Sequence, residues 1–158
     1  MHYDTLNSVA RKAGTTTMIM KLIESHQLSL HTTVSEILHS FKHKEIEIHH
    51  LLTHSSGLPA DIPNAKGLKN KEDVIERIYN FDLINPVGEK IVYSDIGYIL
   101  LGFIITKILK KPINQYAEEL IFKPLNMVDT SYTPPKERCA PTEFRSDDVY
   151  EGLLQGQV

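Results

Sequence analysis

The segment Ile96–Leu109 is apolar on nearly every side, and this restricts the possible folds more than any other feature of the chain. Its run Ile96–Thr106 is interrupted only by Gly97 and Gly102. At about eleven residues it is too short to cross a bilayer, which takes about twenty. A helix without a polar side has to be enclosed by other elements. We therefore expect a buried helix and no membrane span.

The rest of the chain is predicted to be helical segments joined by turns. Apolar residues in Ser8–His26 recur near a period of 3.6, which is typical of a helix with one buried side. Shorter helices are expected at Thr33–His39, His49–Thr53, Glu72–Tyr79 and Ile113–Phe122. With about six helices and almost no strand, the predicted fold class is mainly α.

Several helix starts are marked by capping residues. Thr32 or Thr33 can cap the helix that follows, with Glu36 as the partner in a capping box. Ser94 and Asp95 form an N-cap pair in front of the apolar helix. Such local signals favour helix boundaries at these positions.

Composition excludes several classes of protein. The 158 residues have a net charge of −3 and contain no Trp, so neither a basic surface for nucleic acid nor a platform for stacking bases is expected. The single Cys139 excludes an internal disulfide. Residues Met1–Ser8 are polar and show no basic-then-apolar pattern of a signal peptide.

Three blocks of sequence resemble the motifs of one family. His49–Pro59 reads HHLLTHSSGLP and is similar to the "LLTHTSGLP" signature of the serine β-lactamase-like family, which holds class C β-lactamases, DD-peptidases and related esterases. Thr15–Leu22 and Tyr93–Gly102 match two further blocks of the same family. The resemblance implies a helical domain inserted into an antiparallel sheet, and acyl-serine chemistry on β-lactams, D-alanyl peptides or small esters.

The family's Ser-x-x-Lys motif falls on Ser8, which the resemblance makes the nucleophile. Arg11 stands where the family has the Lys that helps take the proton. A guanidinium stays protonated in proteins, so Arg11 could orient Ser8 but could not accept its proton. Lys12 follows four residues after Ser8, near the same helical side, so a shifted register is an open alternative.

The family's Tyr-x-Asn motif is read as Tyr93-Ser94-Asp95. The resemblance makes Tyr93 the phenol that moves a proton between nucleophile and leaving group, with Asp95 at the Asn position. Without the resemblance, a half-buried Tyr in front of an N-cap would be the better interpretation.

A third motif, a Lys- or His-led triad with Gly on a strand, has no match after Asp95. In the family that strand supplies the second N–H of the oxyanion hole. We therefore expect a truncated member, with residues 1–135 forming a partial, mostly helical domain and residues 136–158 an irregular tail leading to a missing sheet.

The functional prediction is a serine hydrolase that is weakly active or inactive by itself. Its partner would be a small acyl substrate, with no cofactor and no nucleic acid, and intact relatives are often extracytoplasmic. Two alternatives stay open: a non-catalytic binding module on the same helices, and an enzyme completed by another chain that contributes the sheet.

Two further expectations concern surfaces. His50 and His54 have the i, i+4 spacing of helical metal ligands, but no Glu or Cys partner stands beside them, so we expect no metal. His54 and Thr53 are better interpreted as hydrogen-bonding groups at a helix end. Without a covering sheet, Met18–Ile23 and Ile96–Leu109 should expose an apolar face through which the chain self-associates.

Overall fold

Nearly all of the regular structure is helical in the computed structural model, which describes residues 9–63, 70–132, 135–139, 141, 143–146 and 151–155. The elements in chain order are α1 (Val9–Glu24), α2 (Val34–Ile37), α3 (Ile48–Leu52), α4 (Lys71–Asn80), α5 (Asp95–Leu109), α6 (Ile113–Ala117), the π turn η3 (Glu118–Phe122), the 3-10 turn η4 (Lys136–Arg138), β1 (Glu143–Ser146) and β2 (Glu151–Leu154). The mainly α prediction is confirmed.

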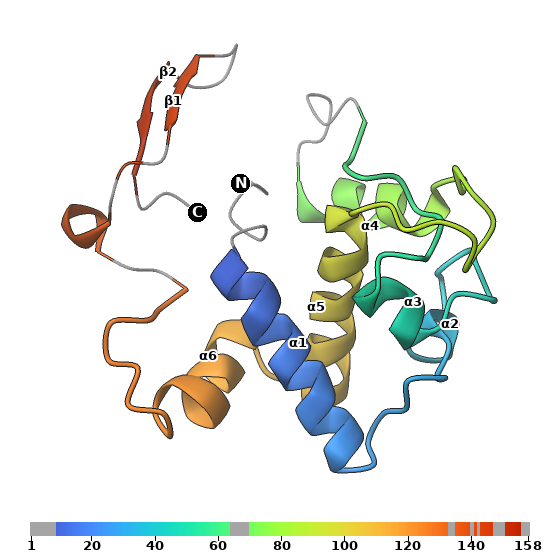
Figure 1. Ribbon diagram of the computed structural model, residues 1–158, viewed down its shortest axis with the longest axis horizontal. Coiled ribbons are helices and arrows are strands. Elements are labelled where there is room, and N and C mark those ends of the chain that lie inside the picture. The colour runs from blue at the N-terminus through green and yellow to red at the C-terminus, as the bar shows by residue number, and fades with distance from the viewer. Residues whose placement is uncertain are drawn as a thin grey trace.

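Helix α5 lies at the centre of the helical part, with α1 packed along it and α2, α3 and α6 also in contact with it (Figure 1). This arrangement buries the apolar residues that the sequence places all around the helix. The buried residues of α5 are Ile96, Gly97, Ile99, Leu100, Leu101, Ile104 and Ile105. Among the described residues, no helix is long and apolar enough to cross a membrane.

Both ends of α5 have local stop signals. Ser94 is the N-cap, and its Oγ accepts a hydrogen bond from the Gly97 N–H at 3.3 Å. Lys110 closes the helix in the left-handed region at φ 54°, and Pro112 then begins α6 as its N-cap. The predicted N-cap pair is therefore divided: Ser94 is the cap and Asp95 is the first helical residue.

The predicted capping box of α2 is also present. Thr33 is its N-cap, and the Thr33 N–H donates to Glu36 Oε2 at 2.7 Å. Asn70 caps α4 differently, because its side-chain Oδ1 accepts a hydrogen bond from the Asp73 N–H at 2.8 Å. The capping box of α2 involves residues only three positions apart, which is why the sequence alone predicts it, whereas the Asn70 cap was not predicted.

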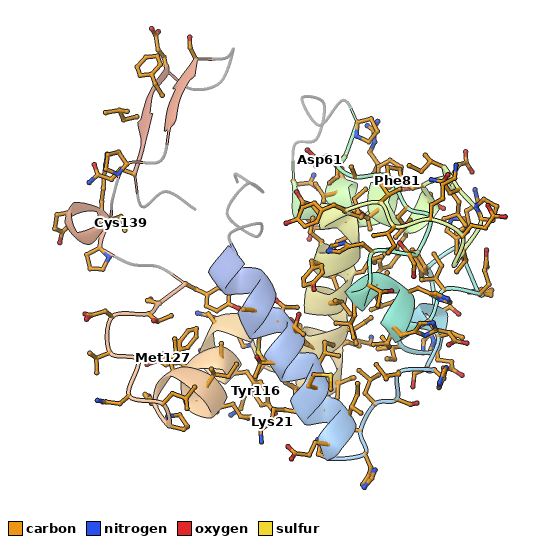
Figure 2. All side chains as sticks on the ribbon, viewed as in Figure 1. Lys21, Asp61, Phe81, Tyr116, Met127 and Cys139 are labelled. Atoms are coloured by element: carbon orange, nitrogen blue, oxygen red, sulfur yellow. The ribbon has the colours of Figure 1, made fainter. Side chains whose placement is uncertain are left out.

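The C-terminal part differs from the irregular tail predicted for it. Strands β1 and β2 pair antiparallel, with Phe144 opposite Leu153. Both of those side chains are more than half exposed, so the hairpin contributes little to the core and leaves no apolar periodicity in the sequence. Cys139 directly follows η4, close to this hairpin, and its carbonyl accepts from Gln155 Nε2 at 2.7 Å (Figure 2).

The predicted apolar face is wrong for α5, because neighbouring helices enclose it. On α1, Met18, Ile19 and Leu22 are fully buried, and Met20 is 48% exposed. Large apolar side chains are instead exposed outside these two helices, on the segment after η3 among other places, where Leu125 is 67% and Val128 80% exposed.

We expect self-association through this segment rather than through α5, because two neighbouring exposed apolar side chains favour burial against a second copy. Light scattering on dilute protein should detect a species larger than the monomer. The variant carrying Leu125→Asp and Val128→Asp should be monomeric. A monomeric wild-type chain that binds no hydrophobic dye would contradict the expectation.

Candidate active site

The predicted nucleophile lies outside the described residues. Ser8 directly precedes α1, and Arg11 belongs to the first turn of that helix, but only the backbone of Arg11 is described. Further along α1, Thr15 is buried and Thr16 Oγ1 lies 3.1 Å from the phenolic oxygen of Tyr98 on α5. This hydrogen bond joins the motif block Thr15–Leu22 to the motif block Tyr93–Gly102.

The turn after α3 is built from residues with special backbone conformations. Helix α3 ends at Leu52, and Thr53 Oγ1 donates to the His49 carbonyl at 2.7 Å. His54 and Gly57 then adopt left-handed conformations, with φ of 58° and 75°. A Cβ on Gly57 would lie 2.1 Å from the carbonyl oxygen of Asn85, so only Gly fits there.

Four backbone hydrogen bonds join this turn to the segment that leads into α5. The Ile84 N–H donates to the Gly57 carbonyl, and the Gly88 N–H donates to the Ser55 carbonyl, both at 2.8 Å. The Val92 N–H donates to the carbonyl of His54 at 2.9 Å, and the Asp95 N–H donates to the carbonyl of Ala60 at 2.8 Å. The motif blocks His49–Pro59 and Tyr93–Gly102 therefore lie side by side although about forty residues separate them.

His54 lies at the centre of this arrangement. Its Nδ1 accepts a hydrogen bond from the Ser94 N–H at 3.0 Å, so the proton of the neutral ring is on Nε2. Its ring packs against Tyr93 at 4.6 Å between centroids and is stacked with Tyr98 at 5.2 Å. The interpretation of His54 as a hydrogen-bonding group of the turn is confirmed, but its position between two tyrosines is new.

The Tyr93 residue is partly accessible to solvent. The residue is 58% exposed, and extended backbone carries it directly before the buried N-cap Ser94. Ser94 Oγ also donates to the Pro59 carbonyl at 2.6 Å, which holds this backbone against the turn. This position also fits the alternative of a half-buried Tyr in front of an N-cap. Asp95 begins α5, and its N–H donates to the Ala60 carbonyl at 2.8 Å.

Both histidines of the i, i+4 pair accept hydrogen bonds from backbone N–H groups. His50 Nδ1 accepts from the Glu47 N–H at 3.0 Å, and His54 Nδ1 accepts from Ser94. Partial burial is the main cause that lowers the pKa of His50, and the neighbouring His49 lowers it further. A neutral ring at position 50 suits its role as a hydrogen-bond acceptor for the start of α3.

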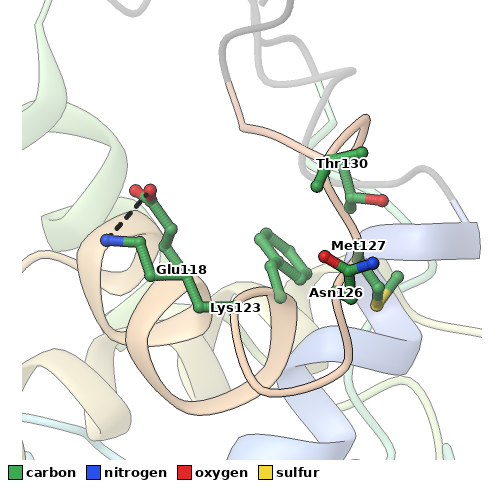
Figure 3. Close-up of a pocket in the computed structure, with 7 residues that line it drawn as sticks. Glu118, Lys123, Asn126, Met127 and Thr130 are labelled. Atoms are coloured by element: carbon green, nitrogen blue, oxygen red, sulfur yellow. Dashed lines mark ion pairs between the residues drawn. The ribbon is translucent and has the colours of Figure 1, made fainter.

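One cavity in the described part of the chain lies apart from these motifs. It measures about 310 Å³ and is formed by the π turn and the segment after it, with Glu118 and Lys123 paired at 3.4 Å on one side (Figure 3). Its lining residues are Glu118, Phe122, Lys123, Asn126, Met127, Val128 and Thr130. None of them belongs to a motif block, so the cavity does not identify the active site.

The sequence profile of the family described as Beta-lactamase matches residues 10–151. The chain belongs to the β-lactamase family. The resemblance predicted from the three motif blocks is therefore confirmed. This β-lactamase family member is 30% identical over 170 residues to N-acetylmuramyl-L-alanine amidase of Bacillus subtilis, a match that covers 95% of this chain and 38% of that protein.

Solved structures place the helices within the same fold. A β-lactamase/D-alanine carboxypeptidase from Yersinia pestis superposes with a TM-score of 0.69 at 26% identity, over 81% of this chain and 40% of that one. D-amino acid amidase from Ochrobactrum anthropi superposes with a TM-score of 0.67 at 26% identity, over 80% and 38% of the two chains. This β-lactamase family chain thus spans about two fifths of the length of these relatives.

Proposed function

We propose that this chain carries the nucleophile and proton-shuttle parts of a serine hydrolase site that acts on acyl compounds such as β-lactams, D-alanyl peptides or small esters. The relatives, an amidase, a carboxypeptidase and a second amidase, are named for cleavage of amide or peptide bonds, which occur in acyl compounds of this class.

One observation carries the proposal: the three motif blocks converge through a continuous set of side chains. Thr16 on the nucleophile helix contacts Tyr98, whose ring stacks on His54, and His54 in turn packs against Tyr93. Ser8 stands eight residues before Thr16 in the sequence.

In the proposed reaction Ser8 Oγ attacks the acyl carbonyl and forms an acyl-serine ester, while its proton passes to the leaving group by way of the Tyr93 phenol. His54 fixes the backbone of Ser94 and the ring of Tyr93, and so acts as a positioning residue. Asp95 takes the Asn position of the motif, and Arg11 would hold Ser8 in place as a fixed positive charge.

The 158 residues alone should hydrolyse neither a chromogenic cephalosporin nor p-nitrophenyl acetate faster than their Ser8→Ala variant. Loss of a general base costs about 10²–10⁴ in rate, and loss of one oxyanion donor costs about 10²–10³. Arg11 cannot serve as that base. The Lys- or His-led triad of the family, whose strand supplies the second oxyanion donor, has no match after Asp95. A Ser8-dependent rate above the control would show that the catalytic residues are misassigned.

Covalent labelling tests the nucleophile itself. Intact-mass measurement after exposure to a fluorophosphonate should show one adduct, because a reactive reagent needs less transition-state stabilisation than substrate turnover. The adduct should disappear in Ser8→Ala and persist in Ser55→Ala, which removes a hydroxyl of the turn after α3. Labelling that is lost in Ser55→Ala instead would move the nucleophile to that turn.

A second function, a non-catalytic binding module, is favoured by one observation. Arg11 stands where the family has a Lys, and a guanidinium that cannot lose its proton suits binding of a carboxylate better than proton transfer. A wild-type chain that forms no adduct with fluorophosphonate or penicillin would support this function and contradict the hydrolase.

A further inference from the structure

Three side chains with metal-binding atoms converge beside the start of α3, and none of them is assigned to the proposed hydrolase site. His31 Nδ1 lies 2.9 Å from Glu47 Oε2, and His49 Nδ1 lies 3.1 Å from the same oxygen. Their three ligand atoms all lie within 4.8 Å of one another.

The backbone that carries these side chains is paired. Thr33 and Glu47 form an antiparallel bridge, the Ile48 N–H donates to the Thr32 carbonyl, and the His49 N–H donates to the Leu30 carbonyl, both at 3.0 Å. The two strands of chain that contribute His31 on one side and Glu47 with His49 on the other are thus held together. Rotation of side chains alone can adjust the three ligand atoms.

The spacing of the ligand atoms suits one small ion. Zinc binds imidazole nitrogen and carboxylate oxygen at about 2.0–2.2 Å, so two ligands of a tetrahedral site lie about 3.3–3.6 Å apart. The two nitrogen–oxygen distances of 2.9 and 3.1 Å are slightly shorter, so a small outward rotation of the side chains would admit the ion. The set of two histidines and one carboxylate favours zinc and similar transition metals over magnesium or calcium, which take oxygen ligands.

Access and the surroundings also fit an ion. The His31 side chain is 79% exposed, so an ion can enter from solvent, whereas Glu47 and His49 are about one third exposed. The ring of His50 packs on His49 at 3.9 Å between centroids and restricts its orientation. The Leu30 carbonyl oxygen, 3.2 Å from His49 Nδ1, or a water could complete the coordination.

We propose that His31, Glu47 and His49 form a binding site for a divalent transition-metal ion of the zinc class. The site uses none of the residues assigned to acyl chemistry, so the two proposals stand or fall separately. The ion would tie the segment before α2 to the start of α3, the helix whose other end leads into the turn with His54. Its effect is therefore expected on stability rather than on the proposed chemical step.

Titration calorimetry with zinc chloride on the untagged chain near pH 7.5 tests the site. We expect one ion bound per chain, with the melting temperature raised by zinc and unchanged by magnesium. Binding should weaken at least about tenfold in His31→Ala and in His49→Ala. It should also weaken below about pH 6, because protons compete for the imidazole nitrogens.

His39→Ala is the matched control, because His39 is an exposed histidine whose Nδ1 lies 3.3 Å from the Ser35 carbonyl, outside the cluster. This variant should bind zinc as the wild-type chain does. The exposed His31 side chain caps no helix, so His31→Ala should fold normally, as circular dichroism can verify. Absence of zinc binding by the wild-type chain, or equal binding by wild type and His31→Ala, would overturn the proposal.

Discussion

Gly57→Ala should lower the free energy of unfolding by about 3 kcal/mol or more. The left-handed backbone at φ 75° is strained for Ala, and the added Cβ would lie 2.1 Å from the carbonyl oxygen of Asn85. Because the obstacle is backbone rather than a flexible side chain, the turn has to move. That movement breaks the hydrogen bond from the Ile84 N–H to Gly57, which joins the turn to the segment before α5.

Gly102→Ala provides the control for this experiment. Gly102 lies within α5, and its added Cβ would be in ordinary contact with Ile113 at 3.8 Å. Ala is favoured over Gly in a helix by about 1 kcal/mol, so this variant should equal or exceed wild-type stability. Urea unfolding measures both variants. Equal losses at the two positions would show that the close approach to Asn85 does not determine the role of Gly57.

Leu100→Ala should cost about 2–5 kcal/mol of unfolding free energy, because it leaves a cavity in a fully buried position. Leu100 belongs to α5, which α1, α2, α3 and α6 all contact, so no single neighbour can move to fill the space. The resulting chain should melt at a lower temperature and unfold at a lower urea concentration.

Ile91→Ala removes a similar amount of apolar side chain from the surface. Ile91 is 80% exposed, so its truncation should change the unfolding free energy by no more than about 0.5 kcal/mol. If Ile91→Ala destabilised the chain as much as Leu100→Ala does, Ile91 would have to be covered in solution, for example by a second copy of the chain.

The arrangement around His54 explains how a short motif can serve two others. Its carbonyl accepts from the Val92 N–H and its Nδ1 accepts from the Ser94 N–H, so both sides of Tyr93 are attached to the same residue. The stacked Tyr98 extends this contact to Thr16 on α1. A substitution at His54 is therefore expected to disturb the position of Tyr93 even if His54 contacts no substrate.

The sequence alone determined the helices and the family. Helix periodicity and N-caps depend on residues three or four positions apart, so α1, the capping box of Thr33 and Glu36, and the cap at Ser94 can be predicted without knowledge of the fold. The apolar composition of α5 similarly required it to be buried. The three motif blocks are contiguous stretches of sequence, so the resemblance to the β-lactamase family was visible in them directly.

Only the tertiary structure decided which distant residues meet. His54 lies between Tyr93 and Tyr98, and His31 reaches Glu47, because backbone pairing joins segments that are far apart in the sequence. The sequence marks Gly57 as a turn residue, but the carbonyl of Asn85 that excludes any side chain there is a long-range neighbour. No local sequence pattern predicts such contacts, because they depend on how the other elements pack around the buried helix α5.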